Sequence, residues 1–237
     1  MRNTLAIFWK ETKSYFGSPM AYVVGAVFLA LTGYFFVSSI SRPFAEASIR
    51  GWLLPATFFL IFWAPALTMR LFAEEQKLGT LELLLTAPVQ DWEVVLGKFL
   101  ASLVTFLGTL SFTLYYVLLL FWFGDPDIGP LLSGYLGLIL YGSACLAIGL
   151  CASSLTSNQI VAAIVGSGVL LLMALADQAA GIVGGVASQV LEQISLTAHF
   201  EDFARGVIDT HHVVYYLLVT AFVLFLTERN LDSRRWR

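Results

Sequence analysis

The chain has 237 residues, of which 58% are hydrophobic and 12% are charged, and its mean hydropathy is +0.81. Soluble domains carry roughly 25% charged residues, so this composition excludes an ordinary soluble enzyme, a disordered chain and a disulfide scaffold. The net charge of −3 provides no basic surface for nucleic acid. The sequence therefore predicts an all-α polytopic membrane protein that does not bind nucleic acid.

Residues 1–18 predict an amphipathic helix that lies in the inner membrane interface. Apolar side chains, among them Phe8 and Trp9, recur at helical spacing. The other positions hold Lys10, Glu11 and Lys13. Such a helix places its two lysines near lipid headgroups. A cleavable signal peptide is not expected, because charged residues break the apolar run.

Six stretches without charge are long enough, or nearly so, to cross a bilayer, which takes about 20 mostly apolar residues. The predicted transmembrane helices are 20–40, 52–69, 99–123, 131–153, 160–176 and 213–227. Every Asp, Glu, Lys and Arg lies outside them, which argues against an ion-coupled carrier built on buried carboxylates. Cys145 and Cys151 fall on different faces of the fourth helix, where we expect packing and no disulfide.

The distribution of basic residues predicts the orientation. With the N-terminus in the cytoplasm, ten of the 13 Lys and Arg residues lie inside and three lie outside, in agreement with the positive-inside rule. An even number of spans returns the C-terminus to the same side. We therefore expect a multi-pass protein of the inner (cytoplasmic) cell membrane with both termini in the cytoplasm.

Residues 70–98 form a long internal connection between the second and third spans. The second span is predicted to continue as a helix beyond the membrane and to end at Gly79, since glycine readily adopts the left-handed conformation. Thr80 can cap a new short helix that Pro88 ends, and Asp91 can cap the third span.

The leucines of this short helix require a buried place. They can rest on lipid or on the protein's own spans, or Leu81 and the leucines at 83–85 can enter a groove on a soluble partner. In the second case Glu74, Glu75 and Lys77 would fix the register of docking. Periodicity does not separate these two alternatives.

Residues 177–212 form the long external connection between the fifth and sixth spans. This segment is too polar to span the membrane and too apolar for a free loop, so it predicts an extracellular helical hairpin. Its adjacent His211 and His212 would point to different faces of a helix, and together with the distant His199 they are weak metal ligands.

Motifs for energised chemistry are absent from the sequence. It contains no G-x-x-x-x-G-K-[ST] phosphate loop, no paired Cys/His metal spacing and no nucleophile elbow. We therefore expect no catalytic residue, no metal ligand and no cofactor in this chain. Energy for any driven process must come from another protein.

The internal segment "EEQKLGTLELLLTAPV" resembles the cytoplasmic motif E-x-x-x-G-T-x-E-x-L-L-x-x-P of type-2, exporter-like ABC transporter permeases. The positions that match are Glu75, Gly79, Thr80, Glu82, Leu84 and Pro88. The N-terminal "KETKSYFGSPMAYV" and the tail from "HFEDFARGVIDTHH" onward are similar to the gliding-motility-associated branch of that class.

The resemblance implies six spans per subunit, a second permease subunit (the same chain or a related one) and two copies of a cytoplasmic ABC ATPase that binds ATP and Mg. It implies that residues 1–18 are an elbow helix, with Phe8, Trp9, Lys10 and Lys13 in the interface. It also implies that the internal connection contains a coupling helix that contacts the ATPase. The expected ATPase-coupling residues are Glu74, Glu75, Lys77, Gly79, Thr80, Glu82, Leu83, Leu84, Leu85 and Pro88.

In this family the external connection forms short re-entrant helices, and here it is expected to gate the outer end of the interface between subunits, through Phe200, Phe203 and Arg205. A simple surface hairpin is the alternative. The resemblance places the contact between subunits on the first and fifth spans. Gly166 and Gly168 of the fifth span can serve it, or can pack within the subunit like small residues of the fourth span.

These features lead to one main functional hypothesis and one alternative. The chain is expected to be the membrane-spanning permease subunit of an ABC transporter, which couples ATP hydrolysis by a separate subunit to export or to mechanical work. Since no sizeable outer domain is present, an extracytoplasmic accessory subunit is a further expected partner. The alternative is a non-transporting membrane scaffold or assembly factor for a multi-subunit envelope complex.

Overall fold

The computed structural model describes residues 2–41, 48–82, 89–124 and 126–235. All regular structure in these ranges is α-helical, so the predicted all-α polytopic class is confirmed. The helices are α1 (Arg2–Gly17), α2 (Pro19–Ile40), α3 (Arg50–Thr68), α4 (Arg70–Leu78), α6 (Asp91–Phe123), α7 (Ile128–Leu155), α8 (Gln159–Ala174), α9 (Ala176–Val183), α10 (Gly185–Ile194), α11 (Leu196–Arg205) and α12 (Thr210–Arg235).

Five helical stretches of the described residues are long and apolar enough to cross a membrane. They are Pro19–Ile40, Arg50–Leu78, Asp91–Phe123, Ile128–Leu155 and Thr210–Ser233. A sixth exists only if α8 and α9, which are bent by 41° at Leu175, form one broken span. The 16 residues of α8 extend about 24 Å, which is less than the ~30 Å hydrocarbon core. The predicted fifth span is therefore broken before Asp177, which lies in the first turn of α9.

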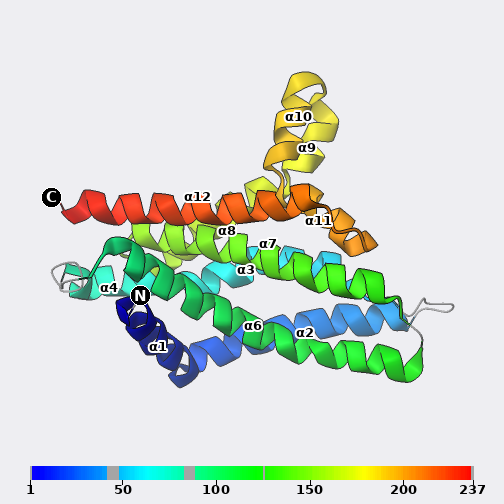
Figure 1. The fold of residues 1–237 in the computed structure, drawn as a ribbon, viewed down its shortest axis with the longest axis horizontal. Helices are drawn as coiled ribbons and strands as arrows, with labels where there is room; N and C mark the ends of the chain where they lie inside the picture. The colour runs from blue at the N-terminus through cyan, green and yellow to red at the C-terminus, as the bar shows by residue number, and fades with distance from the viewer. Residues whose placement is uncertain (1, 42–47, 83–88, 125, 236–237) are drawn as a thin grey trace.

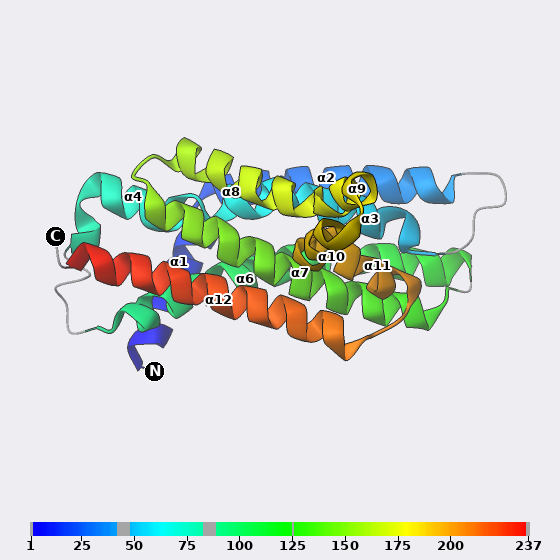
Figure 2. The ribbon, with the colours of Figure 1, turned by 90° about the horizontal axis from the view of Figure 1, so that it is seen from above.

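The long helices run side by side along the long axis of the molecule, as Figures 1 and 2 show. Among them α7 is the central helix, in contact with α3, α4, α6, α8, α11 and α12. Both termini and α4 lie toward the same end of the bundle in the two views.

The sequence left open whether the glycines of α7 and α8 serve packing within the subunit or contact with another subunit, and the structure separates these two uses. A Cβ at Gly142 would overlap the ring of Phe106, and one at Gly149 would overlap Thr68, so both positions serve packing within the subunit. Gly166 likewise faces Pro65. Only open space surrounds a Cβ built at Gly168, as judged from the described residues, so this glycine is available to another molecule.

The N-terminal helix α1 packs lengthwise on α6, where Gly97 leaves room for Ile7. Its outward face is apolar, with Leu5, Trp9 and Phe16 more than half exposed. Glu11, which the sequence placed outside the apolar spacing of α1, is nevertheless buried and 8% exposed. The inner face of α1 packs on protein helices and not on lipid, and it therefore includes polar groups that find partners there.

The external connection is not a single hairpin. α9 and α10 project from the side of the bundle in Figure 1, and no residue of α10 is buried. α11 instead packs against α7, α3 and α8. The segment 177–212 thus contains a projecting helix pair followed by a helix that belongs to the core.

Candidate functional site

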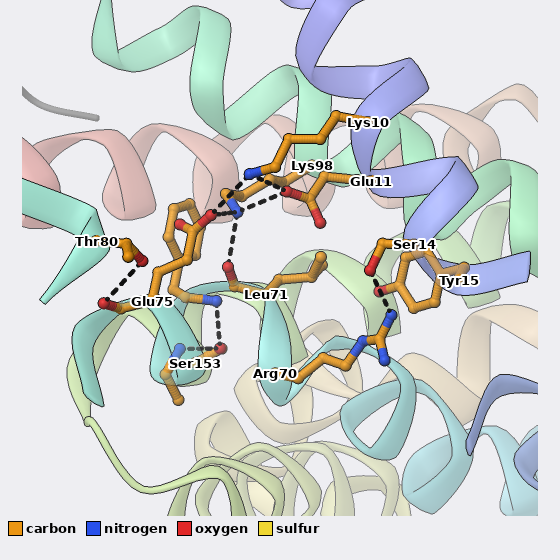
Figure 3. Close-up of polar contacts among 12 residues, drawn as sticks. Lys10, Glu11, Ser14, Tyr15, Arg70, Leu71, Glu75, Thr80, Lys98 and Ser153 are labelled. Carbon is orange, nitrogen blue, oxygen red and sulfur yellow. Dashed lines mark hydrogen bonds and ion pairs between the residues drawn. The ribbon is translucent and has the colours of Figure 1, made fainter. Parts of the chain in front are cut away.

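The sequence motif lies where four helices meet at the end of the bundle that carries both termini. Figure 3 shows side chains from α1, α4, α6 and α7 converging there. α4 follows α3 after a break at Met69 and ends at Gly79, whose φ of 69° is left-handed. The predicted continuation of the second span and its stop at Gly79 are both observed.

Lys98 of α6 forms the centre of this junction. Its side chain is 0% exposed, and its Nζ lies 2.8 Å from Glu75 Oε1 of α4 and 3.3 Å from Glu11 Oε1 of α1. The same ammonium group donates a hydrogen bond of 2.7 Å to the Leu71 carbonyl. One buried charge therefore ties three helices together, and its partners offset the cost of removing it from water.

Lys10 of α1 supplies a second positive charge at the edge of this cluster. Its Nζ lies 3.4 Å from Glu11 Oε1 and 3.6 Å from Glu75 Oε1. Burial lowers the pKa of Lys10, but the carboxylates of Glu11 and Glu75 raise it by more, so the net pKa lies above its ordinary value. Two carboxylates thus share two ammonium groups. The Lys10 side chain contacts these acidic groups while it stays 68% exposed, and its place near lipid headgroups stays a prediction.

Arg70, the first residue of α4, fixes the other end of α1. Its guanidinium donates hydrogen bonds to the hydroxyls of Ser18, at 2.8 Å, and Ser14, at 3.1 Å. It also lies over the ring of Tyr15, whose hydroxyl donates to the Leu67 carbonyl at 3.0 Å. α1 is therefore held at two points along its length, by Lys98 of α6 at one point and by the junction of α3 with α4 at the other.

Ser153 of α7 completes the first turn of α4. The first N–H groups of a helix have no partner within it, and the Ser153 hydroxyl accepts from the N–H groups of Phe72 and Ala73, both at 3.1 Å. The same hydroxyl donates to the Met69 carbonyl at 2.8 Å. The break between α3 and α4 is thus braced from the central helix.

The C-terminal end of α7 binds α4 a second time and also binds α12. The side-chain amides of Gln76 in α4 and Asn230 in α12 each donate to the Ser154 carbonyl at 2.9 Å. The polar contacts described at this end of the bundle consequently link α1, α3, α4, α6, α7 and α12.

The predicted coupling residues do not share one surface. Glu74, Lys77 and Thr80 are exposed, as are Gly79 and Glu82. Glu75 points inward, with its side chain 16% exposed. The sequence assigned it to docking, whereas the structure shows it bound to the buried lysine. Leu83, Leu84, Leu85 and Pro88 lie outside the described residues.

Helix resumes at Thr80 directly after Gly79, as the sequence predicted, and residues 80–82 are helical. The Thr80 hydroxyl also donates to the Glu75 carbonyl at 3.4 Å, which links the new helix to the end of α4. One predicted helix cap is assigned differently by the structure. Gln90, not Asp91, is the cap of α6, and its backbone N–H donates to the Glu93 carboxylate at 3.3 Å.

Sequence reasoning missed Glu11, Arg70, Lys98 and Ser153. A signal for Lys98 was present, since it lies four residues after Val94 and four before Ser102 on the buried stripe of α6. Ser153 carried no comparable signal, because it lies far from its partners in the sequence, 81 positions from Phe72.

The residues predicted for the elbow helix differ in their burial. Phe8 is partly buried, whereas Trp9 and Lys13 are exposed. At the other end of the bundle, Phe200 and Phe203 are fully buried, and both approach the backbone of α7 at Gly137. Arg205 is exposed and pairs with Glu201 at 2.9 Å. Their gating role stays a prediction.

Comparison with known proteins covers most of this architecture. The profile described as ABC-2 family transporter protein matches residues 37–195. Two curated relatives are the probable multidrug ABC transporter permease YbhR of Escherichia coli strain K12 and its counterpart in E. coli O157:H7. Each is 28% identical over 180 residues, which is 69% of this chain and 48% of the relative. The chain thus spans about half the length of these relatives (48%), and the family match runs from the end of α2 through α10.

Proposed function

The chain belongs to the ABC-2 family of transporter proteins, and from this premise we propose that a cytoplasmic ABC ATPase drives it by pushing on α4. In this proposal the chain is the membrane permease subunit of a machine that performs export or mechanical work. The observation that carries the proposal is the construction of α4. Its outer face exposes Glu74, Lys77 and Leu78, while its inner face is fixed to α1, α6 and α7.

A helix held in this way acts as a rigid lever. A force on its exposed face passes to α3 through the Met69 junction and to α6 through Lys98. Ligand-driven movement requires contacts that differ between two states. The ATPase would supply them by closing on ATP, since this chain carries no nucleotide motif of its own. ATP and Mg belong to the ATPase in this scheme.

The proposed assembly has two ATPase subunits and a second permease subunit, with an extracytoplasmic accessory subunit as a further partner. The end of the bundle with α4 and both termini faces the cytoplasm of an inner-membrane protein. The excess of Lys and Arg predicted for that side supports this orientation. The outward apolar face of α1, with Leu5, Trp9 and Phe16, supports a position in the membrane interface.

The test is co-purification of a co-expressed ABC ATPase from the same organism with a permease changed at the exposed face of α4. We expect Lys77→Glu combined with Leu78→Asp to weaken binding of the ATPase by about tenfold or more, since interface anchors contribute about 2 kcal/mol or more. Both side chains are exposed, and Leu78 is 67% exposed, so the fold is expected to persist.

The matched control is Glu192→Lys, a charge reversal on the exposed surface of α10. It should leave ATPase binding unchanged. Full retention of the ATPase by the Lys77→Glu, Leu78→Asp variant would contradict the lever. An ATPase whose hydrolysis rate does not respond to the permease would favour the scaffold alternative.

A further inference from the structure

All three histidines of the chain lie together where α11 packs beside the start of α12. His199 comes from α11, and His211 and His212 come from the first turn of α12. One ring nitrogen from each lies within 4.8 Å of the others. On sequence alone the three were only weak metal ligands, since a helical His-His pair diverges and His199 is 12 positions away.

A tight turn produces the grouping. Gly206, at φ 99°, ends α11 in the left-handed conformation and reverses the chain. The Asp209 carboxylate then accepts from the backbone N–H of His211 at 2.8 Å, which fixes the start of α12. The two helices therefore present their histidines to one another.

His199 is held with one ring nitrogen available. Its Nδ1 lies 2.8 Å from the Ser195 carbonyl oxygen. A carbonyl only accepts, so Nδ1 carries the proton and Nε2 keeps a lone pair. The ring is 4% exposed and stacks on Tyr215 with centroids 3.8 Å apart. Burial lowers the pKa of His199, which favours the neutral ring.

His212 shows the same arrangement with its nitrogens exchanged. Its Nε2 lies 2.8 Å from Asp202 Oδ2, so this nitrogen donates to the carboxylate. Its Nδ1 is buried and has no hydrogen-bond partner among the described residues. Histidines that bind metals almost always donate their second nitrogen to a carboxylate or a carbonyl in this way. A buried lone pair without a donor is otherwise a cost to the fold.

We propose that His199, His211 and His212 bind a divalent transition-metal ion, Zn²⁺ in preference, at the α11–α12 turn. Three imidazole nitrogens with a fourth position for water make a tetrahedral zinc site. Zinc–nitrogen bonds of about 2.0–2.1 Å place the nitrogens roughly 3.3 Å apart, so the three rings must close from their present separation. His211 is exposed, and its ring centroid lies 5.9 Å from that of His199 and 5.5 Å from that of His212.

The bound ion would fasten α11 to α12. α11 already packs on α7 through Phe200 and Phe203, so the metal would fix the start of α12 to the central helix. The site is separate from the α4 junction and does not depend on the proposed ATPase coupling.

The experiment uses the full chain, purified in detergent through a tag without histidine and stripped with a chelator. Zn²⁺ is titrated, and the bound metal is counted by mass spectrometry. We expect one zinc per chain, and Co²⁺ should give the visible absorption of a tetrahedral site. Zinc should raise the melting temperature of the wild-type chain, because it binds the folded state.

Two variants separate metal binding from structure. His211→Ala changes an exposed residue, so its melting temperature without zinc should equal that of the wild type, while its zinc affinity falls about tenfold or more. Asp202→Asn keeps a hydrogen-bond acceptor but removes the charge behind His212, and should weaken zinc by roughly 10–100-fold. Glu192→Gln, an exposed acid on α10, is the control and should bind zinc normally.

Zinc that binds these variants as tightly as the wild type would overturn the proposal, because binding would then be adventitious. Absence of stoichiometric zinc from the wild-type chain would overturn it as well.

Discussion

At the scale of the residue, Lys98 is the most consequential side chain of the α4 junction. A lysine that is completely buried is stable in its charged form only with compensating partners, and here Glu75, Glu11 and the Leu71 carbonyl provide them. These partners lie on α1 and α4. The position of the lysine therefore fixes how both helices sit on α6.

Lys98→Met should destabilise the protein by about 3 kcal/mol, because removing one member of a buried ion pair leaves its partner uncompensated. The loss would be measured as a lower melting temperature in detergent. Lys10→Met is the matched control: its side chain is 68% exposed, and exposed pairs contribute about 1 kcal/mol or less.

Adding Glu75→Gln to Lys98→Met should recover part of the lost stability, since Glu11 can still pair with Lys10 at 3.4 Å. Equal stability of the single and double variants would show that the carboxylate of Glu75 does not need the lysine.

The residues of the junction were partly open to prediction. The family motif drew attention to Glu75 and Gly79 because both are local features of sequence. The partners of Glu75 were not predictable, since Lys98 and Lys10 reach it from other helices. The three histidines were named only as weak metal ligands for the same reason: the left-handed turn at Gly206 brings together rings that helical spacing keeps apart.

At the scale of the element, α1 is a clamp on α6 as well as a membrane-facing helix. The contact depends on a close approach, because a Cβ at Gly97 would lie 2.9 Å from Ile7 Cγ2 and 3.1 Å from the Thr4 carbonyl oxygen. The sequence predicted the helix but not where it packs, since amphipathic periodicity is compatible with burial against lipid or against protein.

Gly97→Val should loosen α1, because overpacking costs about 2 kcal/mol. The loosening can be measured at Thr12, which is 5% exposed. A Thr12→Cys variant is made in a chain with Cys145 and Cys151 replaced by Ala, so that its thiol is the one that is labelled. Its labelling by a polar maleimide should accelerate roughly thirtyfold. Gly108→Val on the same helix meets only open space among the described residues, so it should leave the labelling rate unchanged. If both valine variants accelerated the labelling equally, the close contact at Gly97 would not be what holds α1 on α6.

Helix ends that depend on the local sequence were predicted better than helix ends that depend on packing with other parts of the protein. Gly79 stops α4 through its own backbone preference. The break at Leu175 and the projection of α9 and α10 depend on what surrounds them, and hydropathy alone joined residues 160–176 into one span.

At the scale of the whole molecule, one side of the bundle presents an apolar surface suited to a second subunit. Figure 2 shows α2, α3 and α8 along this side, with α3 packed against both of the others. Leu54, Phe58 and Phe62 are exposed on successive turns of α3. On α8, Gly168 lies between exposed Val165 and Leu172, where a small residue allows close approach of another helix.

A cysteine at Gly168 should therefore form a disulfide between two copies of the chain, if the permease pairs with itself through α8. The experiment introduces Gly168→Cys into the chain without Cys145 and Cys151, treats native membranes with a mild oxidant, and measures the dimer on a non-reducing gel. Gly108→Cys is the control at mid-helix on α6, outside this surface, and should remain monomeric. Since a two-fold axis brings equal positions of an isologous interface together, efficient cross-linking requires Gly168 to lie close to that axis. Dimer formation by Gly108→Cys but not by Gly168→Cys would move the interface from α8 to α6, whereas cross-linking by neither would contradict a self-pairing that brings the two Gly168 positions together.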